Sequence, residues 1–264
     1  MGISLPFLKR GPVVAVIRMS GMIAEGGRGL SDQSLAPLIE KAFRKGKPVA
    51  VALVINSPGG SPVQSALIAA RIRRLSAEKG IPVYAFVEDM AASGGYWLAT
   101  AGDEIFVDDS SLVGSIGVIY AGFGFTDLLG KVGVERRVHT AGKSKSFLDP
   151  FSPEKKTDVT RLKALQAPIH EAFIAQVKAR RGAKLPEGQD LFTGDIWVGA
   201  QAIDVGLADS IGHLVPVMKE RFGDKVRFTS YGRKKPLLSR LGASFIGDAM
   251  AEVEERAMRA RFGL

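Results

Sequence analysis

Two short apolar runs, joined by one helical segment, constrain the fold of this chain more than any other feature. Residues 48–55 form a continuous run rich in β-branched side chains, and residues 83–87 form a second one. Between them, Ser61 followed by Pro62 is typical of a helix start, and Gly80 ends the helix. Continuous apolar runs favour strands that are buried on both faces of a parallel sheet. The segment therefore predicts a β–α–β unit.

The alternation of strands and helices extends in both directions from this unit. Residues 13–23 are typical of an earlier strand and residues 35–43 of a helix. After the second apolar run, residues 93–100 predict a buried helix and residues 104–107 another strand. Alternation of this kind predicts an α/β fold with parallel strands and right-handed crossovers.

The second half of the chain is expected to add mainly helices. The pattern predicts a strand over 134–140 and helices over 123–131, from 152 onward, over 195–206 and over 214–222. Pro168 should kink or split the long helix that starts near residue 152. The last residues, 233–264, are basic at first and then amphipathic. A helix that packs on a partner is the first interpretation of this tail, and a membrane-surface helix is the second.

Ser93 stands where the second apolar run turns into the next helix. Two glycines follow it, so a backbone or a substrate carbonyl can approach its hydroxyl closely. The N-terminus of a helix also stabilises negative charge through its free N–H groups. This arrangement suits a nucleophile, but serine is also a preferred N-cap, so a purely structural role is the alternative.

A second loop, residues 56–60, falls at the carboxyl end of the neighbouring strand. Ligands bind at this edge in open α/β sheets. The N–H of a glycine in this loop and the N–H of Gly94 could together face an oxyanion formed at Ser93, as acyl transfer requires. The alternative for the Ser-Pro-Gly-Gly sequence is an ordinary turn.

A serine nucleophile needs a base, and the residues alone leave its identity open. The chain has no cysteine, and its three histidines lack the spacing of a zinc site, so no metal is expected. His139 lies at the end of a predicted strand, among arginines and without an orienting carboxylate. Lys145 and Lys143 are the other candidates, because a lysine whose pKa is lowered can accept a proton at neutral pH.

Five segments, in the same order, resemble the signal peptide peptidase A family (peptidase family S49, including SohB-like members) in its half-length form. These are residues 55–60, 90–96, 114–118, 142–146 with 149–151, and 204–209. The resemblance implies a ClpP/crotonase-like α/β fold of stacked β–α–β units with C-terminal helices. It divides the chain into a peptidase domain, residues 1–232, and a helical tail, residues 233–264. It also implies a serine endopeptidase that cleaves short or unfolded apolar peptides, such as signal-peptide remnants, without a cofactor.

The resemblance assigns roles to five residues. Ser93 matches the nucleophile and Lys145 the general base of a Ser–Lys dyad. Ser115 matches a serine that orients the lysine amine, and Gly60 and Gly94 match the backbone donors of the oxyanion hole. In this family the lysine can reach the serine of a neighbouring protomer in a ring-shaped homo-oligomer.

Two other functional classes remain open, a crotonase-like acyl-CoA thioester enzyme and a catalytically silent scaffold. The net charge of +9 comes without a nucleic-acid motif, so no nucleic-acid partner is expected. No apolar run approaches the ~20 residues of a membrane span, and the N-terminus is not that of a signal peptide. We expect no N-terminal anchor of the kind that many family members carry. We therefore expect a cytoplasmic location, with peripheral contact to the inner membrane as a further hypothesis.

Overall fold

A computed structural model describes residues 11–26, 29–142 and 144–232, together with residues 253, 256, 257, 259, 260 and 263. The strands are β1 (Val13–Ser20), β2 (Ala50–Ser57), β3 (Val83–Ala92), β4 (Glu104–Val107), β5 (Leu112–Gly114), β6 (Ile196–Val198), β7 (Ser210–Ile211) and β8 (Arg227–Tyr231). The helices are α1 (Asp32–Arg44), α2 (Pro62–Lys79), α3 (Gly94–Ala99), α4 (Thr126–Lys131), α5 (Lys156–Arg181), α6 (Ala200–Asp204) and α7 (Leu214–Phe222), with a 3₁₀ turn over Gly182–Lys184.

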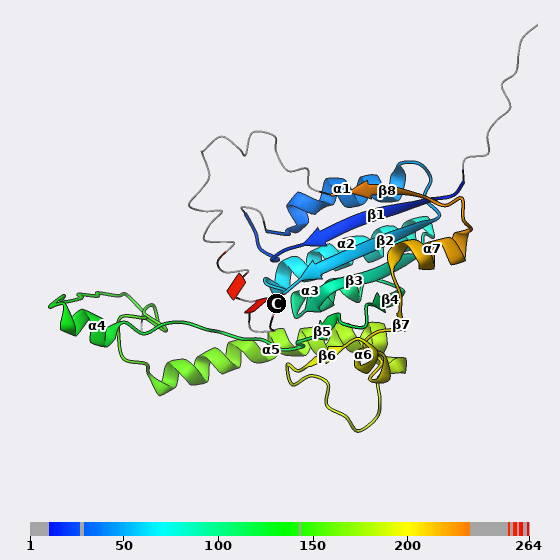
Figure 1. Ribbon diagram of the computed structural model, residues 1–264. Coiled ribbons are helices and arrows are strands. Elements are labelled where there is room, and N and C mark those ends of the chain that lie inside the picture. The colour runs from blue at the N-terminus through cyan, green and yellow to red at the C-terminus, as the bar shows by residue number, and fades with distance from the viewer. Residues whose placement is uncertain are drawn as a thin grey trace, which may run out of the picture.

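The strands form one mixed sheet in the order β6-β5-β3-β2-β1-β8, with β4 and β7 branching from β3 (Figure 1). Strands β8, β1, β2 and β3 run parallel, and among the strand pairs of the described residues the β5–β6 pair alone is antiparallel. β3 pairs with β4 near its start and with β5 near its end. The carboxyl ends of β2, β3 and β5 therefore meet at one edge of the sheet.

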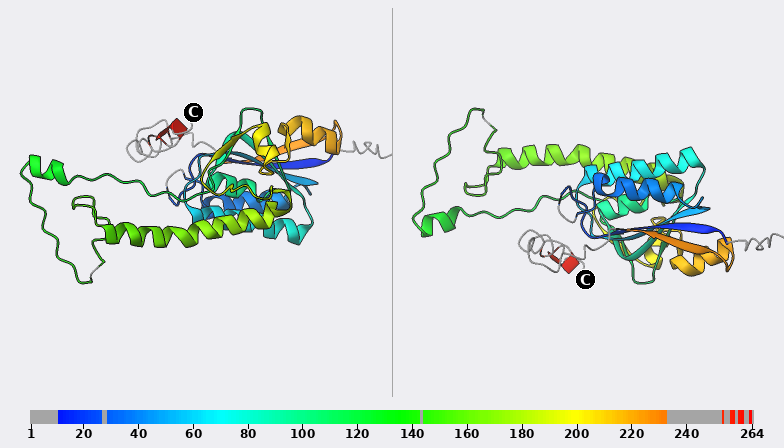
Figure 2. Two further views of the ribbon diagram at one scale, coloured as in Figure 1. Left: turned by 90° about the horizontal axis from the view of Figure 1, so that it is seen from below. Right: turned by 90° about the horizontal axis from the view of Figure 1, so that it is seen from above.

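Helices cover both faces of this sheet (Figures 1 and 2). Helices α1, α2, α3 and the C-terminal half of α5 pack on one face, where the larger core forms. On the other face, α7 packs Met218 against a smaller cluster. The predicted α/β fold of stacked β–α–β units with C-terminal helices is confirmed.

Local signals position the first helices as predicted. The Ser61 hydroxyl caps α2, Pro62 begins it, and Gly80 ends it in the left-handed conformation. Ser31 caps α1 through a reciprocal capping box with Ser34.

Three predicted elements differ from the structure. Residues 134–140 are not a strand but irregular and exposed, and no strand of the described part of the chain pairs with them. Residues 195–206 are not one helix: β6 and α6 are separated by Gly199, whose φ of 47° breaks helical geometry. Of the two outcomes expected at Pro168, a kink or a split, the split does not occur, because α5 is a single helix of 26 residues.

A long arm, residues 118–165, projects from the body of the molecule (Figure 2). It consists of α4, the loops on either side and the first turns of α5, and none of its described residues is buried. The predicted tail, residues 233–264, lies mostly outside the described residues.

Candidate active site

Ser93 occupies a strained turn between β3 and α3. Its φ of 51° and ψ of −121° are unusual for a residue with a side chain. Its N–H donates to the Gly114 carbonyl at 2.8 Å, and its carbonyl accepts from Tyr96 and Trp97. Its hydroxyl makes no capping bond to α3. Ser93 therefore sits at the N-cap position without capping the helix, and its hydroxyl is available for another role.

The loop after β2 touches the Ser93 turn directly. A Cβ on Gly59 would lie 2.8 Å from the Ser93 Cβ, and a Cβ on Gly94 would lie 3.4 Å from the Gly60 nitrogen. Among the described residues, no acceptor receives the N–H of Gly60 or of Gly94. Two free backbone donors therefore lie beside the serine, as an oxyanion hole requires.

Hydrogen bonds fix this loop from both sides. The Gly59 carbonyl accepts from Ile23 N–H at 2.8 Å, and Ser61 N–H donates to the Ile23 carbonyl at 2.7 Å. The buried Ser57 hydroxyl accepts from Gly59 N–H at 3.2 Å. The loop is thus held in place before any substrate arrives.

Ser115 lies next to the serine turn. Its preceding residue, Gly114, accepts the Ser93 N–H, and its own N–H donates to the Asp195 carbonyl at 2.7 Å. Ser115 has a φ of 50°, a second non-glycine residue at a positive φ in this region. The structure therefore brings Ser93, Gly60, Gly94 and Ser115 to one edge of the sheet.

Lys145 does not join this group within one chain. It is exposed, and it belongs to the arm between α4 and α5, which extends away from the sheet edge (Figure 2). Its backbone N–H makes a local hydrogen bond, to the Gly142 carbonyl at 3.2 Å. The competing base Lys143 lies outside the described residues.

The histidines do not contact Ser93 either. His139 is exposed on the arm. His170 bonds the Ile116 carbonyl through Nε2 at 3.1 Å, and His213 pairs with Asp108 at 3.2 Å. Within the part of the chain that the structure describes, no cluster of three or more His, Asp or Glu side chains could hold a metal ion.

Sequence reasoning missed two polar links at this edge. Asn56 Nδ2 donates to Asp89 at 2.6 Å across the point where the β2–β3 register shifts. Arg259 of the tail donates to Asn56 Oδ1 at 3.1 Å. Asn56 lies within the segment 55–60 and Asp89 directly precedes the segment 90–96, but the tail contact has no local sequence signal.

The chain is similar to several known proteases. The model of peptidase family S49 matches residues 76–222. A protein of Synechocystis sp. named as a protease is 31% identical over 234 residues, which are 86% of this chain and 82% of that protein. The chloroplastic serine protease SPPA of Arabidopsis thaliana is 30% identical over 256 residues, covering 89% of this chain and 37% of that protein.

A protein of Brucella melitensis named Na(+)/H(+) antiporter NhaA is 49% identical over 271 residues. The match covers 95% of this chain, but the chain spans only 37% of the length of this protein and of its Brucella abortus counterpart. Most of each relative lies outside the match, so the antiporter name supplies no function for this chain. No helix among the described residues has the length and apolar character needed to cross a membrane.

Proposed function

The chain belongs to peptidase family S49, and from that premise we propose that it is a serine endopeptidase with a dyad of Ser93 and Lys145. The observation that carries the proposal is the strained Ser93 turn beside the two free N–H groups of Gly60 and Gly94. A hydroxyl that caps nothing, next to unpaired donors, is costly in a purely structural turn and useful in acyl transfer.

The proposed reaction proceeds through an acyl-enzyme. The Ser93 Oγ attacks the peptide carbonyl carbon while the neutral Lys145 amine takes its proton. The Gly60 and Gly94 N–H groups bind the resulting oxyanion. The C–N bond then breaks, and the lysine returns the proton to the leaving amine. Water repeats the attack with the same base, releasing the carboxylic acid and restoring Ser93.

We further propose that Lys145 serves the Ser93 of a neighbouring protomer. The arm carries Lys145 away from its own sheet edge, which supports a site completed between chains of a homo-oligomeric ring. Ser115, beside the Ser93 turn, would then bond the incoming amine and orient it. A ring with recessed sites would admit short or unfolded apolar peptides and exclude folded chains.

The test is cleavage of an apolar fluorogenic peptide by the wild type, Ser93→Ala, Lys145→Ala and a 1:1 mixture of the two variants. Ser110→Ala and Lys219→Ala are matched controls, since both side chains are exposed and lie outside the proposed site and the arm. We expect both site variants to be inactive and the mixture to recover activity. Full activity of Ser93→Ala would overturn the proposal, as would turnover of a CoA thioester without peptide cleavage. No recovery on mixing, with subunit exchange verified, would place the dyad within one chain.

The cytoplasmic location and the peripheral contact with the inner membrane stay predictions. Salt-dependent release of the protein from membranes would support the contact. Recovery of all the protein in the low-salt soluble fraction would contradict it.

A further inference from the structure

The helix that carries the nucleophile is too short to hold itself in place. α3 has six residues, and all of them are buried. Isolated helices of this length are unstable, so the position of α3 depends on the groups packed around it. The Ser93 turn and the Gly94 N–H lie at its first residues, and therefore move with it.

Tyr96 makes the polar contact that ties α3 to a distant segment. Its side chain is fully buried, and its hydroxyl donates to the Leu207 carbonyl at 2.9 Å. Burial raises the pKa of this hydroxyl, so it remains a donor at any physiological pH. Leu207 lies within residues 204–209, the one segment of the family resemblance to which no role has been assigned.

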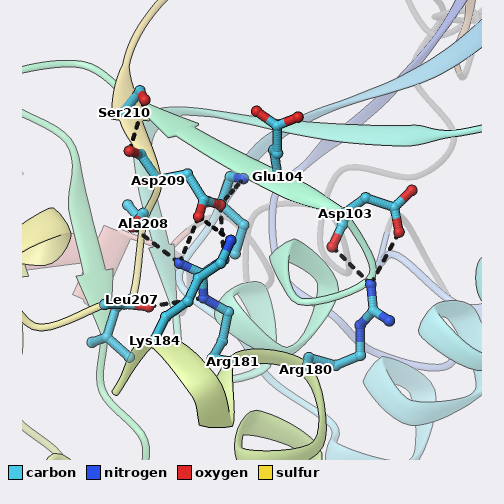
Figure 3. A network of polar contacts seen from close by, with 12 residues as sticks. Asp103, Glu104, Arg180, Arg181, Lys184, Leu207, Ala208, Asp209 and Ser210 are labelled. Carbon is cyan, nitrogen blue, oxygen red and sulfur yellow. Dashed lines mark hydrogen bonds and ion pairs between the residues drawn. The ribbon is translucent and has the colours of Figure 1, made fainter. Parts of the chain in front are cut away.

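Arg181, at the end of α5, fixes that segment on both sides of Leu207 (Figure 3). Its guanidinium donates to the Gly206 carbonyl at 2.8 Å and to the Ala208 carbonyl at 3.0 Å. It also forms an ion pair with Asp209 at 2.7 Å, and only 3% of its surface is exposed. The carbonyl that Tyr96 uses is thus held between two bonds from one buried arginine.

The same helix holds the other end of α3. Thr100 caps α3, and it receives Gln176 on its hydroxyl at 3.0 Å and Arg180 on its carbonyl at 2.8 Å. Trp97 stacks on Phe173 with ring centroids 5.0 Å apart. α5 therefore contacts α3 along its length, and the Arg181 cluster adds a further fixed point near Ser93.

We propose that Tyr96 and Arg181 are positioning residues that hold α3, and with it Ser93 and the Gly94 N–H, in the reactive geometry. The inference rests on the proposed role of Ser93. The presence of a buried arginine–carboxylate pair is by itself weak evidence for a role in stability, since apolar side chains can often replace both partners together without loss. Its bonds to the two carbonyls beside Leu207 instead define where the Tyr96 hydroxyl must lie.

Tyr96→Phe tests this with the loss of a single oxygen. We expect kcat to fall about tenfold, the loss of one buried hydrogen bond, with KM changed less than about twofold. Tyr231→Phe is the matched control, because the Tyr231 hydroxyl is buried without a partner among the described residues.

Arg181→Met should lower kcat further, and Arg181→Lys should restore part of it. Arg221→Met is the control for the loss of an arginine, since Arg221 pairs with Glu104 away from α3.

Mixed oligomers separate positioning from assembly. The test mixes a Lys145→Ala chain, which supplies Ser93, with a Ser93→Ala chain, which supplies Lys145. If Lys145 acts between chains, Tyr96→Phe should lower activity when it is added to the Lys145→Ala chain. It should have no effect when it is added to the Ser93→Ala chain. An equal loss in both arrangements would indicate an assembly defect and overturn the inference.

Amide hydrogen exchange provides a readout that does not depend on peptidase activity. In Tyr96→Phe we expect exchange in residues 93–99 to speed up about tenfold, with β2 unchanged. Suppose that Tyr96→Phe exchanges faster but the wild type cleaves no peptide. The role of Tyr96 in positioning α3 would then stand, and the proposed function would be rejected. Wild-type exchange together with wild-type kcat would overturn the inference itself.

Discussion

Gly60 has a backbone conformation and a close neighbour that a residue with a side chain could not accommodate. Its φ is 138°, and an added Cβ would lie 2.1 Å from the Ile23 carbonyl oxygen. Alanine would displace the loop and its N–H donor, so we expect Gly60→Ala to lower kcat about 10²–10³-fold, the usual cost of one oxyanion donor. Steady-state cleavage of a fluorogenic peptide measures this. Gly46→Ala is the control, because Gly46 also has a positive φ but nothing within 4 Å. Normal activity of Gly60→Ala would contradict the proposed role of this glycine in an oxyanion hole.

Asp209 gives the fold a dependence on pH. Burial alone would raise the pKa of its carboxyl, but hydrogen bonds from Arg181, Lys184 and the Ile105 N–H outweigh burial and hold it below its ordinary value. A lowered folded-state pKa contributes stability that is present above the unfolded pKa, about 3.9, and is lost as the pH falls through the folded value. The free energy of unfolding of the wild type should therefore fall below about pH 4.

The matching variant is Asp209→Asn, which cannot titrate. We expect it to be less stable than the wild type at pH 7 and to lose less stability on acidification. Urea unfolding between about pH 3 and pH 7 compares the two, with the exposed Asp224→Asn as control. Parallel pH profiles of wild type and Asp209→Asn would show that the carboxylate contributes nothing to acid sensitivity.

At the scale of elements, the aromatic contact between α5 and α3 is the clearest source of stability near the site. Phe173 is 3% exposed and stacks on Trp97. Phe173→Ala should lower the free energy of unfolding by about 3–5 kcal/mol, because it opens a cavity in the core. Chemical denaturation measures the change. Leu165→Ala on the exposed part of the same helix should cost much less, and an equal loss in the two variants would argue against a packed α3–α5 contact.

The same elements explain which parts of the fold the sequence could predict. β2, α2 and β3 were predicted because apolar runs, a serine–proline start and a terminal glycine act locally. β8 and β6 were missed, since short strands at the edges of a sheet depend on pairing rather than on their own pattern. The strand expected over 134–140 was wrong for the converse reason: strand-like residues without a pairing partner stay irregular.

The sequence could likewise predict one part of the candidate site and not the other. Ser93 and the glycine loop could be located because a strand end and a helix start define the turn between them. The Tyr96–Leu207 bond could not, since it joins residues 111 positions apart. Nor does any local pattern indicate that Lys145 lies on an arm away from its own Ser93. Contacts between distant segments depend on the completed fold and not on propensity.

For the whole molecule, the arm requires an explanation that one chain does not supply. Many of its large apolar side chains are exposed, among them Phe123 at 82%, Ile119 at 63% and Leu128 at 54%. None of the residues of α4 is buried, and exposed apolar side chains gathered on one projecting segment favour an interaction site. The same arm carries the proposed general base, so a second copy of the chain would cover the apolar side chains and receive the lysine in one contact.

We therefore expect Phe123→Ser combined with Leu128→Ser to dissociate the proposed oligomer and abolish the proposed peptidase activity together, because the arm would lose its apolar contact with the neighbouring chain. Light scattering after size-exclusion chromatography gives the mass, and fluorogenic cleavage of the same fractions gives the activity. Val215→Ser is the control, because Val215 is 46% exposed on α7, outside the arm. A monomer that keeps full activity would show that Lys145 reaches Ser93 within one chain, through a movement of the arm. An unchanged oligomer with lost activity would assign the apolar side chains to the peptide substrate rather than to assembly.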